Sequence, residues 1–268
     1  RGRGAVVGVS GTGSPLIEML LRLGVGRLIL VDPDVVAEEN LNRIIHATRA
    51  DIGRFKVDVI SDAIERAGLG TSVVRVPHYV SDRRVVDLIA EADFIFGCMD
   101  GSEGRSVLNR LATWYLVPYI DVGVKILADG DGEIDEVSTA VHYLQPGLST
   151  LIDRGVFTSD EVLADSLRRA QPEEYLRRRR ERYIVGIEGA RPGVVSVNFF
   201  AASLAVNDFL ARLHSYRTDG NRPYATIRAS LSHVAFYPEP EFGSQSLQKH
   251  VGSGDTEPRL NMPELSRP

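Results

Sequence analysis

The stretch Ala5-Val-Val-Gly-Val-Ser-Gly-Thr-Gly13-Ser-Pro15 decides the fold. Its first three residues form a short apolar run, which predicts a buried strand. A glycine-rich turn follows, and Ser14 and Pro15 suit the N-cap and the first residue of an amphipathic helix. We expect that helix to end at Gly24, because glycine readily takes the left-handed conformation that follows many helices. The order of strand, glycine turn and helix predicts a phosphate site at the helix N-terminus.

Polar residues follow the turn at spacings that suit a nucleotide. Arg27–Val31 reads as a second strand, and Asp32 stands at its carboxyl end. An acidic residue about 20 positions after such a turn accepts hydrogen bonds from a ribose. The candidate nucleotide-binding residues are Gly8, Gly11, Gly13, Asp32, Asp34, Asn40, Arg43 and Lys56.

Two cations in this set favour a triphosphate over a dinucleotide. The dinucleotide fingerprint would need glycine at position 10, where the chain has Ser10, and hydride transfer does not need Arg43 and Lys56. A triphosphate carries about four negative charges and an attacking carboxylate adds one more, so the site needs cations, with Mg²⁺ supplying part of the charge. Two alternatives remain: both cations are solvated helix charges, or the chain is an NAD-dependent oxidoreductase in which both are dispensable.

Strands and helices continue to alternate along the first half of the chain. This alternation predicts an α/β fold with a Rossmann-like, doubly wound, mainly parallel sheet. In the second half Glu136–Leu144 suits an antiparallel strand, and residues 129–135 suit a hairpin turn better than a calcium loop. The other expected elements are strands at Ser72–Val76 and Phe94–Phe96 and helices at Asp82–Ala90, Gly104–Tyr115 and Val194–Leu213.

Composition argues against several classes of protein. The 268 residues are 43% apolar, which suffices for one substantial core. No apolar run reaches the length of a membrane span, and the net charge of −5 argues against a nucleic-acid partner. The run Arg177–Arg182 reads as a solvated helix face, with an acidic protein surface as the second interpretation. The single cysteine, Cys98, cannot form an internal disulfide, which fits a cytoplasmic protein.

The sequence resembles the ubiquitin-activating-enzyme-like adenylyltransferases of the ThiF/MoeB/HesA group, and most of all their bacterial activating domains. The resemblance implies an adenylyltransferase that uses ATP and Mg²⁺ to adenylate the C-terminal carboxylate of a small ubiquitin-like or sulfur-carrier protein, with release of pyrophosphate. The stretches that carry it are Gly8–Pro15, Val31–Asp34, Glu39–Arg43, Gly53–Lys56, Ala92–Arg105, Val117–Gly123 and the late helix from Val194.

The resemblance also implies a role for each site residue. Arg43, Lys56 and Asp100 would be catalytic, and Asp100 would hold Mg²⁺. The implied nucleotide contacts are Gly11 and Gly13 to the phosphates, Asp32 to the ribose, Asn40 and Arg43 to the β- and γ-phosphates, and Lys56 to the α-phosphate. Adenylyl transfer needs positioning and charge neutralisation rather than a general base, since a carboxylate is already a nucleophile.

Three departures from the family pattern alter these expectations. Ser10 replaces a glycine, Asp100 is followed by glycine where relatives often have Asn, and cysteine is nearly absent. Relatives carry cysteine pairs near Pro146–Asp153 and after Tyr237. We therefore expect no zinc, no thioester on this domain, and Cys98 as a small buried hydrophobe. A non-catalytic degenerate scaffold is one alternative, and adenylation of a small molecule or an RNA base is another.

The expected organisation is one adenylation domain over residues 1–238 and a disordered tail over 239–268. Within the domain the resemblance implies a mobile crossover segment at 158–190 near the substrate channel. It also implies a homodimer, and either an acyl-accepting cysteine protein or a fused upstream domain as a further partner. The chain begins at Arg1 without Met, where relatives have a preceding helix, so we expect either that further residues precede Arg1 or that the chain is one domain of a longer protein, such as a fusion.

Overall fold

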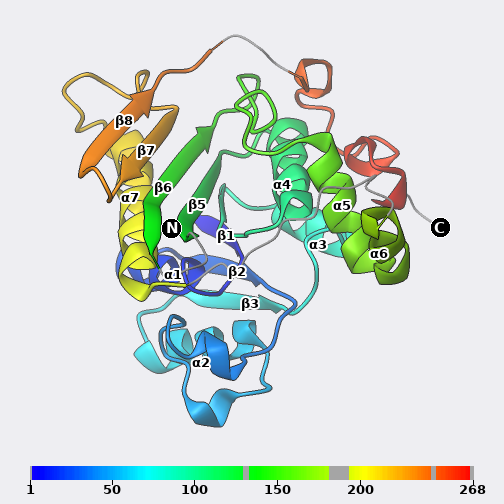
Figure 1. Ribbon diagram of the computed structural model, residues 1–268. Helices are drawn as coiled ribbons and strands as arrows, with labels where there is room; N and C mark the ends of the chain where they lie inside the picture. Colours follow the sequence, from blue (N-terminus) through cyan, green and yellow to red (C-terminus); the bar gives the residue numbers. More distant parts are fainter. Residues whose placement is uncertain (1, 129–132, 181–192, 243–245, 266–268) are drawn as a thin grey trace.

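A computed structural model describes residues 2–128, 133–180, 193–242 and 246–265. Its centre is an eight-stranded sheet in the order β3-β2-β1-β4-β5-β6-β7-β8 (Figure 1). Neighbours from β3 to β5 are parallel, and those from β5 to β8 are antiparallel. This confirms the predicted doubly wound, mainly parallel sheet with antiparallel strands in the second half. The strands are β1 Arg3–Val7, β2 Arg27–Val31, β3 Ser72–Val76, β4 Phe94–Gly97, β5 Tyr119–Ala128, β6 Ile134–Leu144, β7 Thr226–Ser230 and β8 Ala235–Glu239.

Helices cover both faces of the sheet, so its central strands are apolar on both sides. Val6, Leu30 and Phe96 face the layer of α1, α2 and α7. Ala5 and Ile95 face the layer of α3 and α4. Figure 1 shows α7 and α1 on one side of the strands and α4 and α3 on the other. The helices are α1 Gly13–Arg22, α2 Lys56–Ala67, α3 Arg83–Ile89, α4 Ser102–Tyr115, α5 Ser159–Ala170, α6 Pro172–Arg180 and α7 Val195–His214.

Helix α1 begins earlier than the sequence predicts. Thr12, and not Ser14, is its N-cap residue, so the predicted serine cap is wrong. Ser14 lies inside the first turn, buried, and its hydroxyl accepts a hydrogen bond from the N–H of Ile45 at 3.2 Å. Its side chain therefore anchors the following loop instead of capping its own helix. The predicted end is confirmed, because Gly24 follows the C-cap with φ of +78°.

Residues 246–265 contradict the expected disordered tail. Leu247, Leu260, Met262 and Leu265 are buried in the core layer of α3 and α4. Arg83 of α3 binds Glu257 at 2.6 Å, which ties the segment to the same layer. The tail reads as polar overall, but four apolar side chains suffice to fix it because each enters a preformed apolar surface.

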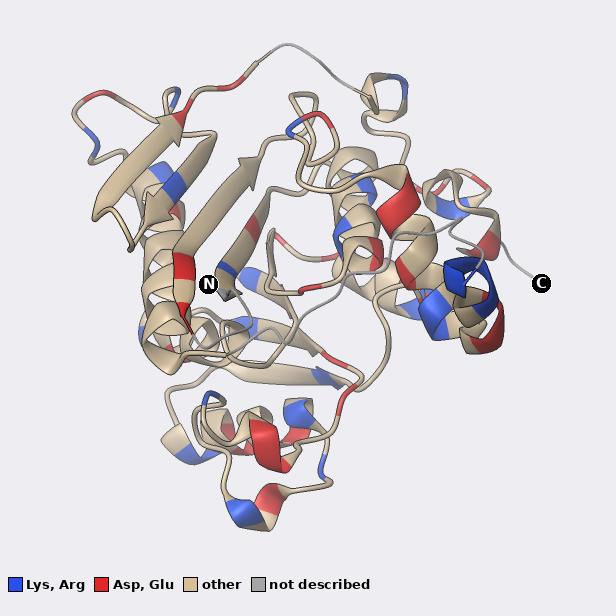
Figure 2. Cartoon of the chain, viewed as in Figure 1, with Lys and Arg blue, Asp and Glu red and all other residues tan. Residues whose placement is uncertain are grey.

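The predicted crossover segment is helical and packed where the structure describes it. The Thr158 hydroxyl accepts a hydrogen bond from the N–H of Glu161 and caps α5, and Asp165 of α5 accepts a hydrogen bond from the N–H of Ser102 at 2.6 Å. Figure 2 shows the arginines of Arg177–Arg180 gathered on α6. The remainder of the predicted segment, 181–190, lies outside the described residues, as does most of the predicted turn at 129–135.

Helix α7 packs its small residues against α1 and the sheet, so it belongs to the core. No helix in the described ranges has both the length and the apolar character needed to cross a membrane.

Candidate nucleotide site

The glycine turn lies at the point where the strand order reverses, between β1 and β4. Gly8 has φ of +90°, and a Cβ there would meet the carbonyl oxygen of Cys98 at 2.5 Å. A Cβ on Gly13 would fall well within 3.0 Å of the carbonyl oxygen of Gly8. Only glycine fits these two positions, and the tight turn brings the N-terminus of α1 to the carboxyl edge of the sheet. Ligands of open α/β sheets bind at this edge, and phosphates bind at such helix ends.

Asp32 closes the turn from the end of β2. It is buried, its Oδ2 accepts the N–H of Val9 at 2.7 Å, and its Oδ1 accepts the N–H of Asp34 at 3.0 Å. Burial raises the pKa of Asp32, while the charge of Lys56 and these two N–H donors act in the opposite direction. Each carboxylate oxygen keeps acceptor capacity for a hydroxyl group. The ribose contact of Asp32 stays a prediction.

Lys56 reaches the same edge from the first turn of α2. A bridge between Val35 and Phe55 aligns the two segments, and Lys56 Nζ donates to Asp34 Oδ2 at 2.8 Å. The Lys56 side chain is 7% exposed, whereas that of Asp34 is 61% exposed. A buried ammonium needs an anionic partner. The structure therefore makes Asp34 the counterion of Lys56, a relation that the sequence did not predict.

Asn40 and Arg43 follow on a short loop that begins with the 3₁₀ turn Glu38–Asn40. Asn40 is buried, and its Oδ1 accepts the N–H of Ala37 at 3.1 Å, so its side chain shapes the loop. The Arg43 guanidinium donates to the carbonyl of Glu39 at 2.6 Å and to Oδ1 of Asn42 at 3.1 Å. Both acceptors are neutral. Among the described residues Arg43 forms no ion pair with a carboxylate, which leaves its charge available to an anion.

Asp100 lies at the same edge, three residues beyond the end of β4, and it is exposed. The described residues contain no group of three or more His, Cys, Asp or Glu side chains that could hold a metal. Mg²⁺ bound to a nucleotide takes most of its ligands from phosphates and water and needs one or two protein carboxylates. An exposed carboxylate at this edge of the sheet fits that form of magnesium binding and does not fit an all-protein site.

Sequence reasoning missed a charge pair between α4 and β5, in which the aspartate is fully buried. Arg105 of α4 places Nε 3.2 Å from Oδ1 of Asp121, and the hydroxyl of Tyr119 donates to the same oxygen at 2.7 Å. Burial raises the pKa of Asp121, and the charge of Arg105 opposes the shift. Arg105 and Asp121 both lie in stretches that carry the family resemblance. The signal that the sequence offered was an aspartate directly after two apolar strand residues.

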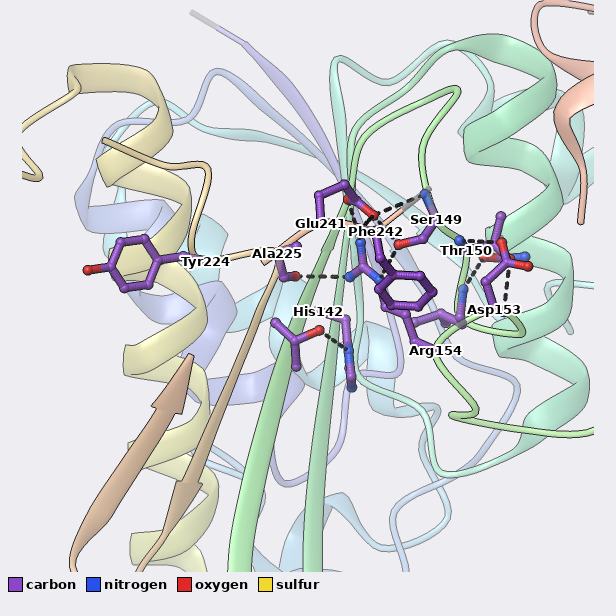
Figure 3. Close-up of polar contacts among 12 residues, drawn as sticks. His142, Ser149, Thr150, Asp153, Arg154, Tyr224, Ala225, Glu241 and Phe242 are labelled. Carbon is purple, nitrogen blue, oxygen red and sulfur yellow. Dashed lines mark hydrogen bonds and ion pairs between the residues drawn. The ribbon is translucent and has the colours of Figure 1, made fainter. Parts of the chain in front are cut away.

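A second buried network joins two segments far apart in the sequence (Figure 3). The Arg154 side chain, 2% exposed, donates to Oε2 of Glu241, to Oγ of Ser149 and to the carbonyl of Ala225, each at 2.9 Å. The Ser149 hydroxyl also binds Glu241. These segments are the ones where the resemblance implied cysteine pairs in relatives. Here an ion pair and a hydroxyl connect them.

His142 lies beside this network and is held neutral. It is buried on β6, and its Nδ1 lies 3.0 Å from the hydroxyl of Thr226. Burial moves the pKa of His142 well below its usual value, and the charges of Arg154 and Arg228 add to the effect. We assign it no catalytic part.

Cys98 is expected to resist alkylation in the folded protein. Burial raises the pKa of its thiol, and the charge of Asp121 raises it further. Each unit of increase lowers the thiolate fraction about tenfold at a fixed pH, and the thiolate is the reactive form. Iodoacetamide at pH 8, followed by mass spectrometry, should modify native Cys98 at least about tenfold more slowly than urea-unfolded protein. Equal rates in the two states would contradict this account and reopen a nucleophilic role.

Comparison with known proteins agrees with the fold and extends over most of the chain. Residues 1–231 match the ThiF family. The molybdopterin-synthase adenylyltransferase of Escherichia coli is 32% identical over 125 residues, 47% of this chain and 50% of that protein. The tRNA threonylcarbamoyladenosine dehydratase of the same organism is 28% identical over 137 residues, 51% of this chain and 49% of that protein. The matched region thus spans about half the length of these curated relatives.

A solved structure shows the same fold over a greater length. The crystal structure of E. coli MccB with ATP has a TM-score of 0.66 and 18% identity, and it covers 91% of this chain and 65% of that one. At this identity the likeness concerns the fold alone. The match to residues 1–231, together with the doubly wound sheet and the glycine turn at its strand reversal, shows that the chain belongs to the ThiF family and has its adenylyltransferase-like fold.

Proposed function

We propose that the chain binds Mg-ATP and adenylates the C-terminal carboxylate of a small ubiquitin-like or sulfur-carrier protein, without forming a thioester on this domain. The observation that carries the proposal is the meeting of the glycine turn, Asp32 and Lys56 at one edge, with Arg43 beside the turn and without a carboxylate partner in the described chain. Such a cationic edge suits a triphosphate.

The reaction needs no proton transfer from the protein. A carboxylate oxygen of the partner attacks the α-phosphorus, a new P–O bond forms, and the bond from the α-phosphorus to the bridging oxygen breaks. Pyrophosphate leaves with that electron pair. In this proposal Asp32 holds the ribose, while Lys56 and Arg43 neutralise the charge that develops on the phosphates. Lys56 would exchange its contact with Asp34 for one with phosphate, and Asp100 would contribute a carboxylate to the Mg²⁺ of Mg-ATP.

Replacing Asp32 by Ala should weaken Mg-ATP binding about 10- to 100-fold, since hydrogen bonds to a charged group are lost. Isothermal titration calorimetry with Mg-ATP, and separately with NAD, measures the effect. Asp93→Ala is a matched control, because Asp93 also accepts a backbone N–H, from Arg3 at 2.7 Å, but at the other end of β1. Binding of NAD alone would support the oxidoreductase. The absence of binding to either nucleotide would favour a degenerate scaffold.

The identity of the group that is adenylated decides between two substrate classes. Resemblance to a molybdopterin-synthase adenylyltransferase supports a small carrier protein. Resemblance to a tRNA threonylcarbamoyladenosine dehydratase supports a modified RNA base, although the net charge of −5 does not favour nucleic acid. Pyrophosphate exchange with a carrier protein that ends in Gly-Gly, compared with AMP formation in the presence of tRNA, separates the two. A homodimer and a cysteine-bearing acyl acceptor on another chain or an upstream domain complete the proposal.

A further inference from the structure

We propose that Gly193 and Asn198, at the start of α7, are positioning residues that fix the Arg43 side chain and the glycine turn for nucleotide binding. This inference rests on the proposed function, since it concerns the same site. It adds two residues that are at least 150 positions distant in the sequence from both the turn and Arg43.

The stem of Arg43 lies against two glycines. A Cβ on Gly193 would fall 2.7 Å from Nε of Arg43 and closer still to its Cδ. A Cβ on Gly11 would lie 3.1 Å from the same Cδ. Any side chain at position 193 would therefore displace the guanidinium. The backbone of Gly193 does not have the positive φ that would by itself require glycine, so the constraint comes from Arg43.

Asn198 holds the turn from the same end of α7. It is 6% exposed, and its Oδ1 accepts a hydrogen bond from the hydroxyl of Thr12 at 3.2 Å across 186 positions of sequence. Its Nδ2 occupies the space that a Cβ on Gly11 would approach to 2.5 Å. The buried amide thus fits against the turn and leaves room only for glycine there.

These contacts make the turn, Arg43 and the start of α7 one unit. A guanidinium on a long flexible side chain loses conformational freedom when it binds an anion, and prior confinement of its stem reduces that loss. Gly193 lies against the stem, and Asn198 holds the turn at Gly11, which lies against the same carbon of Arg43. The inferred effect is on the orientation of the cation, not on the stability of the fold.

The test is a double-mutant cycle on Mg-ATP binding, measured by calorimetry. Gly193→Ala should weaken binding about tenfold, as expected when one charge-assisted hydrogen bond is lost. In the Arg43→Ala background the same substitution should change binding by less than about twofold, because the group that it displaces is gone. Ser196→Ala is the matched control, since Ser196 is exposed in the same turn of α7; it should bind as wild type.

Equal losses from Gly193→Ala in both backgrounds would overturn the inference and point to a general distortion of the turn. An unchanged affinity in Gly193→Ala would overturn it as well. Thr12→Val and Asn198→Ala provide an independent cycle, in which the two losses should not add. Failure of wild-type protein to bind Mg-ATP would instead reject the proposed function, so the two failures are distinguishable.

Discussion

Replacing Arg43 by Ala should slow pyrophosphate exchange about 10²- to 10³-fold, the loss typical of removing one group that stabilises transition-state charge. Its guanidinium contacts only neutral oxygens in the described structure, Glu39 O and Asn42 Oδ1. Little folding energy should therefore be lost, about 0.5 kcal/mol or less, as for ordinary surface positions. The measurement is exchange of labelled pyrophosphate into ATP in the presence of Mg²⁺ and a carrier protein that ends in Gly-Gly.

Arg49→Ala supplies the control for this experiment. Arg49 is 84% exposed on the same loop and already pairs with Glu38 at 3.0 Å, so its charge is neutralised at a distance from the turn. It should exchange pyrophosphate at the wild-type rate. If Arg43→Ala retained wild-type exchange, or if both variants lost activity equally, Arg43 would not be the phosphate-binding cation.

The local sequence predicted the elements that position this site because their signals are local. The apolar run before Gly8 gave β1, and Asp32 stands at the end of β2 as its spacing indicates. The roles assigned to Asp32, Asn40, Arg43, Lys56 and Asp100 remain predictions. Their placement at one edge follows from the rule that parallel strands end together.

The contacts that sequence reasoning missed all join distant positions. Asn198 meets Thr12, Arg154 meets Glu241, and Arg105 meets Asp121, and no periodicity links the members of these pairs. Ser14 shows the same limit for a local signal. Its position after the glycines is typical of an N-cap. The close approach of Gly13 to Gly8 starts the helix earlier, so the Ser14 hydroxyl instead accepts a hydrogen bond from the N–H of Ile45. Tertiary contact overrides local preference at each of these places.

The prediction of a disordered tail after Glu239 failed for a related reason. Its average composition is that of a disordered segment. Whether this segment is ordered depends on the few apolar residues that pack against the rest of the protein. Leu260, completely buried beside α4, is one of them. The segment is also held where it begins, by the contact of Glu241 with Arg154.

Replacing Glu241 by Ala should therefore destabilise the fold by about 3–5 kcal/mol, the cost of leaving a buried charge without its partner. Arg154 is 2% exposed, and burial lowers the pKa of its guanidinium while Glu241 opposes the shift. Loss of Glu241 also removes the acceptor for the Ser149 hydroxyl. Urea unfolding followed by circular dichroism, with wild-type and variant slopes compared, measures the change in the free energy of unfolding.

Glu239→Ala is the matched control, two residues earlier on the same strand end. Glu239 binds Arg228 at 2.7 Å, but both side chains are nearly half exposed, 46% and 44%. Water screens such a pair, so its loss should cost about 1 kcal/mol or less. The contrast between two glutamate–arginine pairs of similar length isolates burial as the cause. If Glu241→Ala cost no more than Glu239→Ala, the Arg154 network would not be what joins the loop at Ser149 to the C-terminal segment.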